Sequence, residues 1–118
     1  MGQMHELPAT QGILATVIEA ARSAGAERIT AVDVVIGDLS SMVDDSVQFY
    51  FDVLSRGTPA AGAQLRMRRV HATATCGECG TSYSVTPPLS PACESCGSLR
   101  ISVRGGREFF IESIQVDE

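Results

Sequence analysis

Two pairs of cysteines constrain this chain more than any other feature of its sequence. The first pair lies in CGECG and the second in CESCG, so a glycine directly follows each pair. In Cys-X-X-Cys spacing a tight turn brings both sulfur atoms to one metal ion. Thirteen residues separate Cys79 from Cys93, enough for a hairpin that closes. The spacing predicts one tetrahedral site made by Cys76, Cys79, Cys93 and Cys96.

The segment that carries these cysteines, residues 73–106, is rich in Ser, Thr, Pro and Gly and has few large apolar residues. Such a segment cannot build a core from side chains alone. We therefore expect a structural Zn(II) ion with all four positions filled by thiolate. An iron–sulfur or rubredoxin-like iron site and a redox dithiol are the alternatives. A rubredoxin-like site favours more aromatic residues than the single Tyr83, and a redox pair sits on a βα turn.

Apolar periodicity outside this segment predicts two helices and three strands. We expect helices over residues 8–24 and 46–56, and strands over residues 28–36, 64–72 and 108–116. The last strand has apolar residues on both faces, which suggests a central position or one covered on both sides. The fold class is therefore α+β: a small α/β domain of residues 4–72 and 107–118, with a zinc-ribbon module of residues 73–106 inserted between two of its strands.

Charge and composition exclude several classes of protein. The chain has 118 residues, a formal net charge of −5 and nine basic residues, all arginine. Nucleic-acid binding usually requires a basic excess, so we expect none. No apolar run approaches the ~20 residues of a membrane span, and we see no secretory signal. We expect a cytoplasmic protein whose cysteines bind metal rather than form disulfides. No nucleophile–base pair or phosphate loop is visible, which disfavours an enzyme.

The beginning of the chain, MGQMHEL, gains meaning only beside the rest of the sequence. His5 is one of two histidines, the other being His71 near the cysteine segment, either a surface histidine or an auxiliary zinc-side ligand. Five sequence features follow one another along the chain: MHEL, IGDLS after the first strand, FDVLSRGTPAAGAQL, the two cysteine pairs and a closing GREFFIESIQV. Together they resemble the HypA/HybF nickel metallochaperones over nearly the whole chain from Met4.

The resemblance implies a non-enzymatic carrier that delivers nickel for maturation of [NiFe]-hydrogenase and, in some bacteria, urease. It implies that transferable Ni(II) binds at Met4, His5 and Glu6, with Asp44 as a further candidate. Low-spin Ni(II) favours nitrogen donors in a square plane, which a terminal amine, an amide nitrogen and an imidazole supply. Here Met1-Gly2-Gln3 precede the motif, so the amine is free only if the chain begins at Met4.

The implied partners are a HypB-like hydrogenase maturation GTPase and the hydrogenase large subunit. A monomer and a dimer are both compatible with this layout. The alternative function is a zinc-ribbon adaptor that binds protein or nucleic acid and has no transferable metal. The change His5→Ala separates the two readings, because only a carrier loses nickel binding while it keeps zinc.

Overall fold

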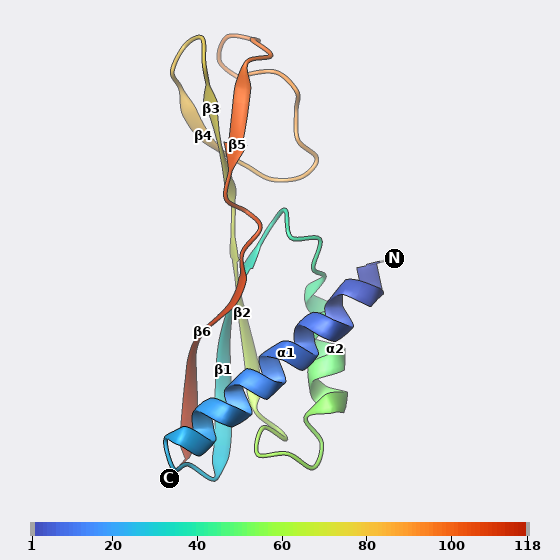
Figure 1. The fold of residues 1–118 in the computed structure, drawn as a ribbon. Helices are drawn as coiled ribbons and strands as arrows, with labels where there is room; N and C mark the ends of the chain where they lie inside the picture. The colour runs from blue at the N-terminus through green and yellow to red at the C-terminus, as the bar shows by residue number, and fades with distance from the viewer. Residues whose placement is uncertain (1, 118) are drawn as a thin grey trace.

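The computed structural model describes residues 2–117, with the backbone alone for residues 2–5. Its elements are α1 (Gly2–Ser23), β1 (Arg28–Gly37), α2 (Asp44–Leu54), β2 (Gln64–Val70), β3 (Ala72–Cys76), β4 (Ser82–Val85), β5 (Ile101–Arg104) and β6 (Phe109–Asp117). They form two three-stranded sheets of order β2-β1-β6 and β4-β3-β5. The sheets lie at opposite ends of an elongated molecule of 55 × 29 × 16 Å (Figure 1). The predicted α+β class is confirmed.

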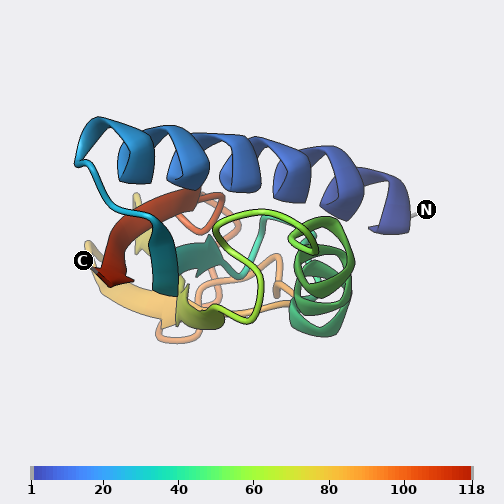
Figure 2. The same cartoon turned by 90° about the horizontal axis from the view of Figure 1, so that it is seen from below.

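The sheet β2-β1-β6 has the longer strands and is called the larger sheet, and β4-β3-β5 is the smaller sheet. The larger sheet and the two helices form the α/β part of the fold. The central strand β1 pairs in parallel with β2, as expected when a helix connects the two strands, and antiparallel with β6. Helix α1 packs against β1 and β6, and α2 against α1 and β2 (Figure 2). The buried cluster between them is Ile13, Leu14, Val17, Ala21, Ile29, Val32, Val34, Ile36, Val47, Phe51, Ala60, Ala63 and Leu65. Every member precedes the cysteine segment, so this core is built without it.

Helix α1 is longer than predicted. We expected it to begin at Pro8 after a flexible start, but it begins at Gly2. The buried stripe continues N-terminally from Leu14 through Thr10 to Glu6, both fully buried. Sequence periodicity missed this extension because those two positions are polar. Pro8 is tolerated inside the helix, where it removes a single main-chain hydrogen-bond donor.

Two strand predictions were wrong. The strand expected over residues 64–72 is two strands, β2 and β3, separated by His71 and belonging to different sheets. The closing strand β6 is an edge strand rather than a central one. A register shift between Asp33 and Val34 of β1 explains its pattern, because such a bulge changes which residues share a face. Among the described residues, neither helix is long and apolar enough to cross a membrane.

The face of the larger sheet opposite the helices carries an ion pair. The Arg66 guanidinium donates to both carboxylate oxygens of Asp33, at 2.7 and 3.0 Å. The Ser113 hydroxyl donates to the same carboxylate at 2.7 Å. The hydrogen bond from Arg66 is the main cause that lowers the pKa of Asp33, and that from Ser113 is the next. The three side chains come from β2, β1 and β6, so they connect all three strands.

The two ends of the molecule meet where the chain leaves and re-enters the larger sheet. Main-chain bonds join Gly37 N to Glu108 O at 2.7 Å, and Leu39 N to Gly106 O at 2.5 Å. A side chain at Gly37 would place its Cβ 2.2 Å from the carbonyl carbon and oxygen of Gly106. Gly106 itself has φ +80, a conformation that favours glycine. Glycine is therefore required on both sides of this crossing.

Candidate metal centres

The four cysteines converge at the far end of the smaller sheet. Cys76 ends β3, and the other three lie in the turns that follow β3 and precede β5. All four Sγ atoms lie within 4.8 Å of one another. The Sγ atoms of Cys76 and Cys96 are 3.6 Å apart, and those of Cys79 and Cys93 are 3.7 Å apart. These separations exclude disulfides, whose sulfur atoms lie about 2.05 Å apart.

Main-chain amides of the turns that hold the cysteines are directed at the sulfur atoms. The amides of Glu78 and Cys79 donate to Cys76 Sγ at 3.3 and 3.5 Å, and the Ser95 amide donates to Cys93 Sγ at 3.4 Å. The amides of Cys79 and Glu78 lower the pKa of Cys76. These contacts stabilise thiolates, the form in which cysteine binds a metal.

The pKa values of the two exposed cysteines, Cys79 and Cys96, shift in opposite directions. The hydroxyl of Thr81, 3.2 Å from Cys79 Sγ, and then the Thr81 amide lower the pKa of Cys79 to about 6. The Ser98 amide lowers the pKa of Cys96, but burial and the neighbouring thiols raise it to about 12. Four thiolates at this spacing repel one another, so a cation at their centre is needed to ionise all four. Thr81 is a contributor that the sequence reasoning missed, although it directly follows the first CGECG.

The sulfur geometry fits a tetrahedral metal ion. A tetrahedron with metal–sulfur bonds of about 2.3 Å has sulfur–sulfur edges of about 3.8 Å. Two of the separations, 3.6 Å between Cys76 and Cys96 and 3.7 Å between Cys79 and Cys93, approach that edge length. The four cysteines can therefore hold one metal ion. His71 does not belong to this group of donors. Its Nδ1 instead lies 2.5 Å from Asp38 Oδ2.

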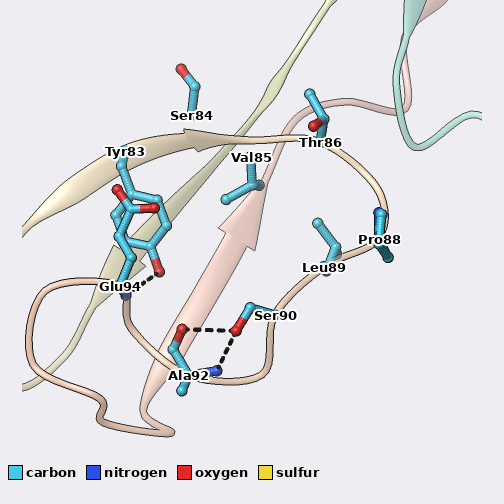
Figure 3. A pocket seen from close by; sticks show the side chains of 9 residues that line it. All are labelled: Tyr83, Ser84, Val85, Thr86, Pro88, Leu89, Ser90, Ala92 and Glu94. Carbon is cyan, nitrogen blue, oxygen red and sulfur yellow. Dashed lines mark hydrogen bonds between the residues drawn. The ribbon is translucent and has the colours of Figure 1, made fainter.

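A hollow of about 250 Å³ lies beside the cysteines, between β4 and the loop of residues 86–94 (Figure 3). The Glu94 amide donates to the Tyr83 hydroxyl at 3.4 Å and closes one side of it. Across the hollow, the Ser90 hydroxyl bonds the amide and carbonyl of Ala92, each at 3.4 Å. Glu94 is the single carboxylate among its nine lining residues, which include no histidine. The hollow therefore lacks the clustered donors of a metal site.

The predicted nickel residues lie in the first turns of α1 and at the start of α2. Met4 and His5 are helical, and their side chains lie outside the described part of the structure. Glu6 is fully buried, and its Oε2 accepts a hydrogen bond from the Val43 amide at 2.8 Å. The structure thus joins the N-terminal end of α1 to the loop before α2, two regions that the sequence brought together only by resemblance.

Asp44, the fourth predicted nickel residue, is bound to an arginine. Its Oδ1 accepts from Arg69 Nη2 at 2.6 Å and from Arg69 Nε at 3.0 Å. The same guanidinium donates to Met42 O at 2.5 Å and lies 3.6 Å from Asp38 Oδ1. Arg69, on β2, therefore holds both ends of the loop between β1 and α2. Sequence reasoning missed this cluster because Arg69 lies 25 residues from Asp44 and 27 from Met42 along the chain.

Comparison with known proteins gives a consistent result. Residues 4–116 match the family described as hydrogenase/urease nickel incorporation metallochaperone HypA. The hydrogenase maturation factor HypA of Chlorobium limicola is 44% identical over 115 residues, covering 98% of both chains. That of Dehalococcoides mccartyi is 39% identical, covering 98% of this chain and 96% of the relative.

Solved structures agree with these relatives at the level of the fold. The solution structure of the Ni metallochaperone HypA from Helicobacter pylori matches with a TM-score of 0.63 and 21% identity, covering 94% of this chain and 96% of that one. A second solution structure of a HypA protein matches with a TM-score of 0.68 and 23% identity, covering 96% of each chain. The family and the four-cysteine cluster, taken together, place this chain in the HypA family of nickel metallochaperones for hydrogenase maturation, which are carriers rather than enzymes.

Proposed function

We propose that this chain binds Ni(II) at its Met4-His5-Glu6 start and delivers it to a [NiFe]-hydrogenase precursor. The observation that carries the proposal is the family match over residues 4–116, which begins at the first residue of this motif. In the proposed site Met4 and His5 supply the nickel donors, Glu6 either adds a donor or steadies the His5 imidazole, and Asp44 is a further candidate. The relatives reported above are hydrogenase maturation factors, so hydrogenase is the proposed client ahead of urease.

Helix geometry supports nickel binding at this end of α1. The first four main-chain amides of a helix have no acceptor within it. If the chain begins at Met4, the amide of His5 is among those four and its nitrogen is available to a metal. The Met4 amine, the His5 amide nitrogen and the imidazole then form adjacent chelate rings of the kind that square-planar Ni(II) favours. With Met1-Gly2-Gln3 present, the amine at Met4 is replaced by a peptide bond.

Both hydrogen bonds from Arg69 fall on Asp44 Oδ1, so nickel would bind either at Oδ2 or by exchange for the arginine. The Asp44 side chain is 43% exposed, which makes that exchange accessible from solvent. An exposed ion pair of this kind stabilises the fold by about 0–1 kcal/mol, so giving it up costs little. The cost of recruiting Asp44 is therefore small beside a nickel affinity in the micromolar range, about 8 kcal/mol.

We propose that Cys76, Cys79, Cys93 and Cys96 hold a structural Zn(II) ion. The near-tetrahedral sulfur spacing supports this, and a site filled by four thiolates leaves no position for substrate. Two separate sheets support a division into a nickel-binding domain of residues 4–72 and 107–118 and a zinc module of residues 73–106. Thiolate ligands are retained in a reducing compartment, which supports a cytoplasmic location.

The proposed partners are a HypB-like maturation GTPase and the hydrogenase large subunit. Membership of a hydrogenase maturation family supports both, because a carrier must receive nickel and pass it on. The acidic balance, −5 before any metal is bound, supports protein partners rather than nucleic acid.

The test is a Ni(II) titration of zinc-loaded protein, with wild type beside His5→Ala, zinc assayed in both and the N-terminus defined by intact mass. We expect one site of roughly micromolar affinity, about 8 kcal/mol, that is lost in His5→Ala while zinc stays bound. A second pair of chains, beginning at Met1 and at Met4, tests the role of the amine. Equal nickel binding by wild type and His5→Ala would favour the zinc-ribbon adaptor instead.

A further inference from the structure

Glu6 is the one carboxylate that the fold buries completely among the described residues. Its exposed fraction is 0%, although it lies one residue from the proposed nickel-binding histidine. Oε2 accepts from the Val43 amide at 2.8 Å, and Oε1 is also buried, without a hydrogen-bond partner in the described part of the chain. Burying a carboxylate is unfavourable unless a specific contact compensates for it. The contact with Val43 is therefore the feature that explains its place in the core.

Val43 is the residue that precedes α2 and should cap it. Its backbone is extended, with φ −104 and ψ 123, and its side chain makes no capping hydrogen bond. In a capping box, a glutamate three residues into the same helix accepts from the amide of the capping residue. Here Glu6 supplies that carboxylate from a different helix, 37 residues away in the sequence. A negative charge is also favoured at a helix N-terminus, so the contact suits α2 electrostatically.

We propose that Glu6 is a positioning residue and that its carboxylate is not a nickel ligand. Its bond to Val43 fixes the first turns of α1 against the N-terminus of α2 and thereby fixes the neighbouring His5. Inside the core, the Glu6 carboxylate faces α2 rather than the solvent from which nickel enters. This inference rests on the proposed nickel site and changes the role of one of its residues.

The experiment compares Ni(II) affinity and the ligand-field absorption spectrum in wild type, Glu6→Gln and Glu6→Ala. Glutamine keeps an acceptor for the Val43 amide but is a poor nickel donor, so we expect near-normal affinity and an unchanged spectrum. Alanine removes the acceptor, so in part of the population the first turns of α1 are no longer docked against the N-terminus of α2. Apparent affinity falls in proportion to that fraction, about tenfold when one molecule in ten remains docked. The spectrum of nickel bound to Glu6→Ala should still match wild type.

Thr10→Val is the matched control, because Thr10 is buried one turn along and its hydroxyl donates to Glu6 O at 2.6 Å. It weakens the same part of α1 and keeps the bond to Val43, so nickel affinity should be unchanged. A shifted spectrum or lost binding in Glu6→Gln would make Glu6 a ligand and overturn the proposal. Wild-type affinity in Glu6→Ala, or an equal loss in Thr10→Val, would also overturn it. If Glu6→Ala does not fold, the spectrum and affinity of Glu6→Gln still decide whether Glu6 is a nickel ligand. Nickel binding that His5→Ala leaves unchanged would instead reject the proposed nickel site itself.

Discussion

Removing metal from the four cysteines should unfold one end of this protein and leave the other intact. The smaller sheet has almost no core of its own: the buried apolar side chains within residues 72–106 are Ala72, Ala74, Cys76 and Cys93. By contrast, the buried cluster of the α/β part contains no residue after Leu65. The two ends should therefore respond differently to a chelator.

The magnitudes favour this outcome clearly. The two buried alanines contribute about 2 kcal/mol together, at ~0.8 kcal/mol per buried carbon. Ordering the backbone costs about 1–2 kcal/mol for each residue. Sheet hydrogen bonds replace bonds to water and return about 1 kcal/mol each. A structural zinc ion bound by cysteines contributes about 10–16 kcal/mol, which makes it the largest single stabilising contribution in this part of the chain.

Hydrogen–deuterium exchange read by mass spectrometry measures the two ends separately. With a strong zinc chelator and a reductant present, amides of β3, β4 and β5 should exchange freely, while those of β1 and the middle of α1 should stay protected. Adding zinc back should restore the lost protection. Continued protection of β3, β4 and β5 in metal-free protein would refute the reasoning, because side chains and backbone alone would then hold the module.

Four other substitutions test the fold. Gly37→Ala should destabilise the protein by about 1–3 kcal/mol in urea unfolding, because its Cβ would lie 2.2 Å from the Gly106 carbonyl. Gly12→Ala should instead stabilise α1 by about 0.5–1 kcal/mol, because nothing lies within 4 Å of the added Cβ. Hydrogen bonds hold the pKa of Asp33 below its ordinary 3.8. The stability that Asp33 contributes to the fold is therefore present above pH 3.8 and is lost as the pH falls through the lower folded pKa. Asp33→Asn should make the free energy of unfolding depend less on pH below about pH 4. Phe51→Ala, at a site only 1% exposed, should lower stability by about 3–5 kcal/mol, measured by the same unfolding curves.

Local sequence signals predicted the parts of this fold that depend on short spacing. Paired cysteines with adjacent glycines identified the cluster, because a turn of four residues determines where both sulfur atoms lie. Apolar stripes placed the middles of both helices and the central strand β1. The insertion between β2 and β6 followed from a change in composition, which does not depend on tertiary contacts.

Apart from Thr81, which lies two residues from Cys79, the features that sequence reasoning missed depend on contacts between distant residues. The extended start of α1 was invisible because Thr10 and Glu6 continue the buried stripe with polar side chains. The break between β2 and β3 was invisible because residues 64–72 read as one strand, and only pairing with different sheets divides that segment at His71. Arg69 could be counted as a surface charge, but its contact with Asp44 depends on how β2 lies beside the loop before α2.

The few groups at the crossing between the two sheets determine how the proposed zinc module is oriented. In the described part of the chain the buried side-chain cluster does not extend into this region, so the main-chain bonds of Gly37, Asp38 and Leu39 and the pair between His71 and Asp38 carry the connection. Main-chain bonds contribute about 1 kcal/mol each and an exposed ion pair about 0–1 kcal/mol. The total is a few kcal/mol, far below the stability that zinc gives the module itself. The contacts that fix the orientation of the module should therefore break before either sheet unfolds. Gly37→Ala should make this orientation more variable while the amides of β1 and β3 stay protected from hydrogen exchange.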